Sequence, residues 1–242
     1  MQLADDSEQR LARIGWRTPT APLDTGGLSH ARVVAQHRAG YQLHDGVTLF
    51  NAQPAARFLK RGLDPTERPA VGDFVVYAPG TPPIIERILP RRTELRRGAA
   101  GAGHQQQIIA TNIDAVLVLN GLDDDFNPAR IERYLLLIQD MGAMPVLVLT
   151  KADKVADAAA VAADLQRRIP GIVIHTINAK SPASIAPLLA YLGPGQTAVL
   201  VGSSGVGKST LTNTLLGESR QATQAVREHD SRGRHTTTYR AL

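Results

Sequence analysis

The sequence predicts an α/β P-loop domain with a mostly parallel sheet, preceded by a small all-β barrel of the OB-fold type. Three observations lead to this prediction. Residues 30–97 contain short β-like runs separated by turn residues, whereas strands and helices alternate from residue 111 onward. The octet Gly202–Ser209 also fits the phosphate-binding pattern G-x-x-x-x-G-K-[ST]. A chain of 242 residues has room for both cores.

The N-terminal half holds the expected barrel. Its spacing of short runs suits a five-stranded OB-fold. Residues 1–29 are rich in Pro, Gly, Thr and charge, and we expect them to form a flexible leader. Residues 98–110 are expected to form a linker between the domains. The strand-like runs are residues 31–35, 40–43, 47–50, 73–77 and 83–89.

Basic residues gather in the same half of the chain. Residues 1–110 carry 14 Lys and Arg against 10 Asp and Glu, whereas the remainder carries 13 against 12. A basic OB-fold is a plausible platform for nucleic acid. A solvated linker, or arginines paired with acidic side chains, would give the same pattern, and the sequence leaves both readings open. The candidate RNA-binding residues are Arg87, Arg91, Arg92, Arg96 and Arg97.

The second half predicts an open α/β sheet. Residues 115–120 form an apolar strand, and a helix over 128–139 is expected because Asn127 can cap it and Pro128 suits its first turn. Two more helices are predicted over 157–168 and 184–192. In such sheets ligands bind at the carboxyl ends of the strands.

The octet Gly202–Ser209 follows an apolar strand and precedes a helix. Its glycines let backbone N–H groups turn toward a β-phosphate, and the helix N-terminus adds partial positive charge. Lys208 is expected to reach the β- and γ-phosphates, and Ser209 to hold Mg²⁺. The predicted phosphate-binding residues are Gly202, Ser203, Ser204, Gly205, Val206, Gly207, Lys208, Ser209 and Thr210.

Two segments upstream of the octet can select the base. The tetrapeptide Thr150-Lys151-Ala152-Asp153 ends a strand, and the Asp153 carboxylate can accept two hydrogen bonds from guanine, which adenine cannot donate. The stem of Lys151 can lie over the ring. A second strand leads into Asn178-Ala179-Lys180, which can offer backbone donors to the guanine carbonyl. The tetrapeptide alone is weak evidence, so an ATP-using P-loop kinase or ATPase stays an alternative.

The order of these motifs, base segments before P-loop, resembles that of a circularly permuted GTPase. The chain is most similar to the ribosome small subunit-dependent GTPase A family, from about residue 30 onward. Further segments that carry the resemblance are Val71-Gly72-Asp73, Pro90–Arg97, Ala110–Asp114 and Gly233–Thr238.

Two departures from the family pattern stand out. Thr150 occupies a position where the family usually has Asn, and its hydroxyl can still tie the loop to the P-loop. The sequence ends four residues after Thr238, without the switch II segment and zinc domain that follow in the family. We therefore expect residues 111–242 to form a C-terminally incomplete GTPase domain. Zinc is expected only in the family's additional domain.

The resemblance implies a hydrolase that converts GTP to GDP and phosphate with Mg²⁺. It implies stimulation by the small (30S) ribosomal subunit, contact with 16S rRNA, and a role in late maturation of that subunit. Switch I would cover residues 221–240, with Thr237 joining Ser209 on Mg²⁺, although Thr236 and Thr238 are alternatives. His235 and Lys208 are the catalytic candidates; a loop histidine without chemistry is an equal reading of His235. The alternative function is a nucleotide-gated rRNA-binding module without turnover.

The composition also limits location and chemistry. The sequence has no cysteine, which excludes disulfides and thiolate metal sites within these residues. No apolar stretch approaches the length of a membrane span, and acidic residues at the N-terminus argue against a secretion signal. We expect a cytoplasmic monomer that binds neither membrane nor DNA.

Overall fold

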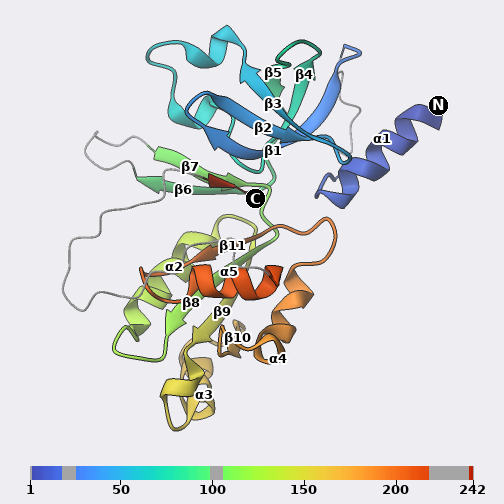
Figure 1. Cartoon of the computed structure of the whole chain (residues 1–242). Helices are drawn as coiled ribbons and strands as arrows, with labels where there is room; N and C mark the ends of the chain where they lie inside the picture. Colours follow the sequence, from blue (N-terminus) through green and yellow to red (C-terminus); the bar gives the residue numbers. More distant parts are fainter. Residues whose placement is uncertain (1, 18–25, 99–105, 218–239, 242) are drawn as a thin grey trace. The chain divides into compact units, whose positions relative to one another are not determined.

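The computed structural model describes residues 2–17, 26–98, 106–217 and 240–241 (Figure 1). The chain divides into two compact units. Unit 1 comprises Met1–Ile113, Pro194–Thr197 and His235–Leu242, and unit 2 comprises Asp114–Gly193 and Ala198–Arg234. Unit 1 is therefore built from three separate stretches of chain.

Unit 1 contains a closed five-stranded barrel. The strands follow one another around the barrel in the order β1-β2-β3-β5-β4, and pairing of β1 with β4 closes it. All pairs are antiparallel except β3 with β5. This arrangement confirms the predicted OB-fold-type barrel. The strands are β1 (Ser29–His37), β2 (Gly40–His44), β3 (Leu49–Pro54), β4 (Phe74–Ala78) and β5 (Ile84–Ile88).

The barrel interior is filled by side chains from alternate strand positions. Val33, Leu43, Val75 and Ile85 have no exposed surface. Two short 3-10 helices, η1 (Ala56–Leu59) and η2 (Pro65–Glu67), lie in the connection between β3 and β4. Phe58 on η1 turns into the same core. A short strand, β12 (Arg240–Ala241), pairs antiparallel with β1.

The predicted linker over 98–110 is wrong in the part that the structure describes. Strand β6 (Glu94–Gly98) pairs antiparallel with β7 (Gln106–Thr111), and residues 99–105 lie outside the described residues. Ile108 and Ala110, two positions apart, are both buried. The two-residue period of a strand is therefore present in this segment, although its glutamines and glycines suggested a flexible tie.

The predicted flexible leader is also wrong over its described part. Residues Gln2–Arg13 form helix α1, and Leu11 and Trp16 are buried against Phe74 and Val76. The proline and glycine residues that suggested a leader occur only from Gly15 onward, beyond the helix. Burial of a leucine and a tryptophan stabilises such a segment against the loss of chain entropy.

The segment after α1 is held by polar contacts within unit 1. The buried Arg32 donates from Nη1 to the carbonyl of Ile14 at 2.5 Å. The N–H of Gly195 donates to the Arg13 carbonyl at 2.9 Å, and Arg17 donates to the Gly195 carbonyl at 3.4 Å. The short stretch Pro194–Thr197 thus binds the C-terminal end of α1 and the residues that follow it.

A buried carboxylate joins distant parts of unit 1. Asp73 has no exposed surface and accepts hydrogen bonds from Arg91 at 2.7 and 2.8 Å, from the Thr111 hydroxyl at 2.7 Å and from the Ala70 N–H at 2.8 Å. Arg91 also donates to the Thr66 carbonyl at 2.7 Å. Burial alone would lower the pKa of Arg91, but the hydrogen bonds and charge of Asp73 raise it above its ordinary value. Arg91 is therefore charged at neutral pH.

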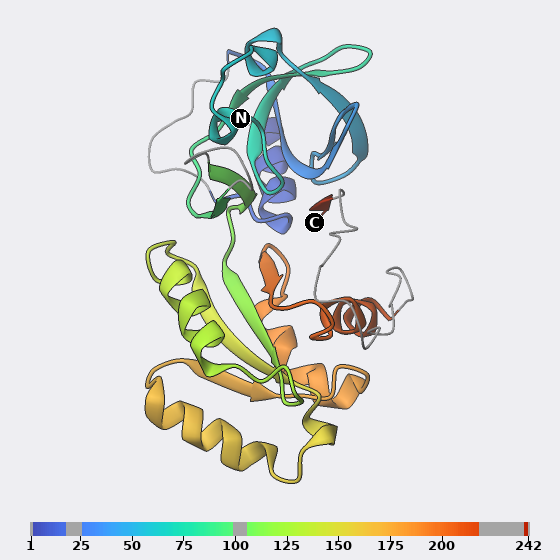
Figure 2. The same cartoon turned by 90° about the vertical axis from the view of Figure 1, so that its left-hand side faces the viewer.

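Unit 2 is an α/β layer structure around a parallel sheet ordered β10-β9-β8-β11. Every residue of β8 is buried, as expected for an inner strand covered on both faces. Figure 2 shows α2 and α5 on opposite sides of this sheet. The strands are β8 (Ala115–Gly121), β9 (Met144–Thr150), β10 (Val173–Thr176) and β11 (Ala198–Val201), and the longer helices are α2 (Pro128–Gln139), α3 (Ala158–Arg168) and α5 (Lys208–Leu216).

Helix boundaries in unit 2 follow their capping residues. The side chain of Asn127 accepts from the Arg130 N–H at 2.9 Å, and that of Asp157 accepts from the Ala160 N–H at 2.8 Å. The helix predicted over 184–192 is instead a short α4 (Pro182–Ile185) followed by the 3-10 helix η4 (Ala186–Tyr191). Pro187 lacks an N–H group, which disfavours a regular α-helix there. None of the helices in the described part of the chain is long and apolar enough to cross a membrane.

Candidate nucleotide site and basic surface

The predicted phosphate-binding octet links β11 to α5 in unit 2. Gly202, Gly205 and Gly207 have φ angles of 153°, 74° and 106°, which side chains rarely adopt. A Cβ atom on Gly202 would lie 2.6 Å from the Leu119 carbonyl oxygen. The glycines of the pattern are thus required by the backbone path of a loop that ends at the N-terminus of a nine-residue helix.

Lys208 lies over this loop. Its ammonium donates to the carbonyls of Gly202 and Ser203 at 2.9 and 2.6 Å. Burial lowers the pKa of Lys208 below its ordinary value, and the charge of Asp125 opposes that shift. A phosphate group would supply the negative charge that the carbonyls provide only partially.

Three hydrogen bonds connect the two candidate base-binding segments with each other, with the P-loop and with the helix α5 that follows it. The buried Thr150 hydroxyl donates to the Val206 carbonyl at 2.7 Å. The Ala152 N–H donates to the Ile177 carbonyl at 3.1 Å, and the Thr214 hydroxyl donates to the Ala179 carbonyl at 2.7 Å. The expected tie from Thr150 to the P-loop is therefore confirmed.

The residues proposed to contact guanine lie at the ends of β9 and β10. The backbone of Lys151 is left-handed, with a φ angle of 58°, and the side chain of Asp153, two positions later, is exposed. The side chain of Asn178 accepts from the Lys180 N–H at 3.0 Å, while the Asn178 N–H donates to the Ser184 hydroxyl at 2.9 Å. These contacts fix the second loop without using the Asp153 carboxylate.

Sequence analysis missed two acidic residues beside the site. Asp123 accepts from Lys151 at 2.6 Å, and Asp125 accepts from the Ser203 hydroxyl and from Arg130, the latter at 2.8 Å. Burial would raise the pKa of Asp123, but the hydrogen bond and charge of Lys151 bring it below its ordinary value. The position of the acidic run directly after a buried strand could have signalled this role, because strand ends of a parallel sheet meet at one edge.

The predicted magnesium ligand Ser209 lies in the first turn of α5 and is partly buried. Among the described residues, no group of three or more His, Cys, Asp or Glu side chains could hold a metal ion. Mg²⁺ commonly binds through few protein oxygens together with phosphate oxygens and water, so a serine hydroxyl beside a phosphate loop fits it. His235, Thr236, Thr237 and Thr238, and nearly all of the predicted switch I, lie outside the described residues.

Replacing Thr150 by Val tests the tie between the base segment and the P-loop. Because the Val206 carbonyl would lose its buried donor, GDP affinity should fall about three- to tenfold. Titration calorimetry measures this change. Thr176→Val, at an exposed position at the end of β10, is the matched control and should leave the affinity unchanged. Equal affinities for the two variants would show that the tie does not position the nucleotide.

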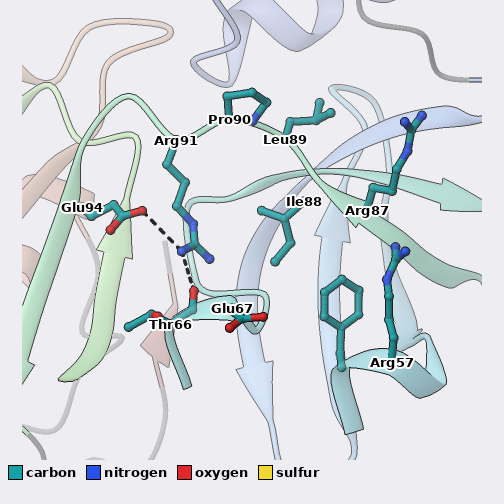
Figure 3. A pocket seen from close by; sticks show the side chains of 10 residues that line it. Arg57, Thr66, Glu67, Arg87, Ile88, Leu89, Pro90, Arg91 and Glu94 are labelled. Atoms are coloured by element: carbon teal, nitrogen blue, oxygen red, sulfur yellow. Dashed lines mark hydrogen bonds and ion pairs between the residues drawn. The ribbon is translucent and has the colours of Figure 1, made fainter. Parts of the chain in front are cut away.

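The predicted RNA-binding arginines of unit 1 differ in the exposure of their side chains and in their hydrogen-bond partners. Arg87, Arg92 and Arg96 are exposed, and Arg96 binds Glu94 at 2.8 Å and Gln106 at 3.1 Å. The side chain of Arg91 is only 10% exposed, and its donors bind Asp73, Glu94 and backbone carbonyls (Figure 3), so Arg91 has a structural role in unit 1 and its RNA contact stays a prediction. The side chain of Arg97 lies outside the described residues.

The connection between β3 and β4 adds basic residues that sequence analysis did not select. Arg57, Lys60, Arg61 and Arg68 are all exposed. Their segment has no strand pattern and lies about 20 residues before the arginine run, so nothing in the sequence placed them near Arg87. The barrel connection therefore contributes four exposed basic side chains, against three in the described part of the predicted run.

The model of the RsgA GTPase family matches residues 88–242 of this chain. A small ribosomal subunit biogenesis GTPase RsgA from Xanthomonas oryzae pv. oryzae is 50% identical over 245 residues, covering 96% of this chain and 66% of the relative. Another from Xanthomonas axonopodis pv. citri is 53% identical over 216 residues, covering 88% of this chain and 58% of the relative. The chain thus spans about two thirds of the length of the curated relatives that it matches.

Solved structures agree on the fold. YjeQ from Thermotoga maritima superposes with a TM-score of 0.62 at 23% identity, over 77% of this chain and 64% of that one. YloQ, described as a circularly permuted GTPase, gives a TM-score of 0.58 at 24% identity, over 80% of this chain and 66% of that one. With a P-loop that follows the base segments, a closed barrel before them and a family model that matches most of its length, this chain belongs to the RsgA GTPase family.

Proposed function

We propose that the chain binds GTP and hydrolyses it to GDP and phosphate. The observation that carries this proposal is the set of hydrogen bonds joining the Thr150–Asp153 segment, the Asn178–Lys180 segment and the P-loop. A guanine-reading carboxylate is useful only when it is held at a fixed distance from the phosphate loop. ATP would leave the Asp153 carboxylate without its two donors, so it should bind poorly.

In the proposed mechanism, water attacks the γ-phosphate in line with the leaving group. Lys208 and the backbone N–H groups of Gly205 and Gly207 stabilise the negative charge on the phosphate oxygens. Bound Mg²⁺, held by Ser209 and Thr237, would neutralise phosphate charge. His235 is proposed to orient the attacking water, because the family resemblance assigns no glutamine to that role.

The proposed partner is the small (30S) ribosomal subunit, through its 16S rRNA, during late maturation. Two observations support it: the matched relatives are named for small ribosomal subunit biogenesis, and the barrel carries several exposed arginines and the exposed Lys60. Such a role places the protein in the cytoplasm. We propose that it acts there as a monomer, on RNA rather than on DNA.

Phosphate release from GTP, with and without purified small subunits, tests this function. We expect at least about a tenfold increase with subunits, since partners that order the switch segments accelerate such enzymes. Lys208→Ala, with its folding checked by circular dichroism, should remove the stimulated release. GDP binding without release under either condition would favour a nucleotide-gated rRNA-binding module. Competition by ATP at concentrations similar to GTP would refute the guanine assignment.

A further inference from the structure

The acidic run that follows β8 contacts two parts of the candidate nucleotide site in unit 2. Asp123 accepts a hydrogen bond from Lys151 of the first base segment at 2.6 Å. Asp125, two positions later, accepts one from the hydroxyl of Ser203 in the phosphate-binding octet. The side chain of Asp124, which lies between them in the chain, is exposed. Asp125 therefore joins the acidic run to the phosphate loop.

The contacts of Lys208 indicate which end of a bound nucleotide lies beside Asp125. In P-loops this lysine reaches the β- and γ-phosphates, whereas the backbone N–H groups of the loop enclose the α- and β-phosphates. The Lys208 ammonium donates to the carbonyls of Gly202 and Ser203 at 2.9 and 2.6 Å. The first two residues of the octet, and Asp125 with them, therefore lie toward the γ-phosphate.

The negative charge of Asp125 is only partly balanced by its neighbours. Its side chain is 31% exposed and pairs with Arg130 at 2.8 Å. The Nε atom of Arg130 is buried and has no hydrogen-bond partner among the described residues. Burial lowers the pKa of Lys208, and the charge of Asp125 opposes that shift, so this charge acts across the loop. A phosphate group at this end of the loop would meet the same charge.

We propose that Asp125 is a specificity-determining residue that disfavours GTP relative to GDP. GTP carries one more phosphate group than GDP, and hence more negative charge, at the end of the site beside Asp125. Like charges at this separation repel, and charges that are partly buried are screened less by salt than exposed ones. GDP lacks the third phosphate group, so its affinity depends little on Asp125. This inference rests on the proposed function and adds a residue that selects between its substrate and its product.

Competition against fluorescently labelled GDP, with the full chain in a magnesium buffer, tests the proposal. The competitors are GDP and a GTP analogue whose imido bridge between the β- and γ-phosphates resists hydrolysis. Asp125→Asn should bind the analogue about five- to tenfold more tightly than the wild-type chain does, and GDP with less than about a twofold change. Asp124→Asn removes the same charge at the exposed neighbour and should change both affinities less than about twofold. Equal changes for both nucleotides in Asp125→Asn would overturn the proposal.

A second neutral variant separates the charge of Asp125 from its shape. Asp125→Ser has a smaller side chain than Asp125→Asn, and it lacks the carboxylate in the same way. Because the proposal assigns the effect to the charge, both variants should favour the GTP analogue to a similar extent. A gain in only one of the two would overturn the proposal, since it would show that the size of the side chain decides the preference.

Removing the partner of Asp125 should act in the opposite direction. Arg130→Gln leaves the carboxylate without its cation, so the affinity for the GTP analogue relative to GDP should fall about threefold. Arg133→Gln, at an exposed position of the same helix, is the matched control and should keep the wild-type ratio. A higher relative affinity for the analogue in Arg130→Gln would contradict the proposal.

The same titrations separate this inference from the function on which it rests. Binding of neither nucleotide by the wild-type chain would refute the proposed function, and the role of Asp125 with it. If the wild-type chain binds both nucleotides and Asp125→Asn keeps the wild-type ratio of their affinities, only the role of Asp125 is refuted. A ratio that changes in Asp125→Asn but not in Asp124→Asn supports both.

Discussion

Asp153→Asn is expected to weaken GDP binding by about two to four orders of magnitude and to create affinity for xanthosine diphosphate. The carboxylate accepts two hydrogen bonds from guanine, whereas the amide of asparagine offers one acceptor and donors. Xanthine carries a carbonyl in place of the guanine amine, so the amide matches it. Asp153 is exposed and lies after β9, in the short 3-10 helix η3 (Ala152–Lys154). The substitution should therefore leave the fold of unit 2 intact.

Competition against labelled GDP measures both affinities. Asp140→Asn, at an exposed position just after α2, is the control for removing one carboxylate, and it should retain the preference for guanine. Unaltered GDP affinity in Asp153→Asn would place guanine selection elsewhere. A loss of GDP affinity without a gain for xanthosine diphosphate would indicate a disturbed loop instead of a changed base contact.

Asp73→Ala is expected to lower the free energy of unfolding of unit 1 by about 3–5 kcal/mol. The carboxylate is fully buried, and its removal leaves the Arg91 guanidinium without its principal partner. The Thr111 hydroxyl and the Ala70 N–H lose an acceptor at the same time. The loss should exceed that of any exposed ion pair, because solvent cannot replace these contacts.

Urea unfolding followed by tryptophan fluorescence measures this effect for unit 1. Trp16 is the single tryptophan of the chain and is buried in unit 1, so its emission reports that unit. Asp164→Ala removes an exposed partner of Arg167 and Arg168 in unit 2 and should leave the Trp16 transition in place. A shift of equal size in both variants would contradict the assigned importance of Asp73.

Features that depend on neighbouring residues in the chain were predictable from the sequence. Helix α2 begins where Asn127 and Pro128 indicated and covers the predicted residues 128–139, and the barrel strands match their runs within a few residues. The glycines of the octet predicted the loop because only their backbone freedom permits its path. The bond from the Thr150 hydroxyl to the P-loop spans 56 positions, and it was expected from the family resemblance, in which Thr150 stands where Asn is usual.

Features that depend on partners far away in the chain were not predictable. Arg91 resembles every other arginine of its run until Asp73, 18 positions earlier, is seen to hold it. Helix α1 is stabilised by Phe74 and Val76 of the barrel, which local composition does not reveal. Asp123 and Asp125 follow a buried strand, but their partners Lys151 and Ser203 were identified only when β8, β9 and β11 were placed side by side. In each case tertiary contact decided the role of a residue whose local signal was neutral.

The hydrogen bond between Gly195 and Arg13, the last residue of α1, has a consequence for the order of folding during protein synthesis. The barrel strands β1 to β5 leave the ribosome together and can close early, because the strand pairings that close the barrel lie within residues 29–88. The Arg13 carbonyl accepts a hydrogen bond from the N–H of Gly195, which is made 182 residues later (195 minus 13). At about 5–20 residues per second, this is a delay of roughly ten to forty seconds. During translation, the first helix therefore waits for a contact that is supplied only after most of unit 2 has been made.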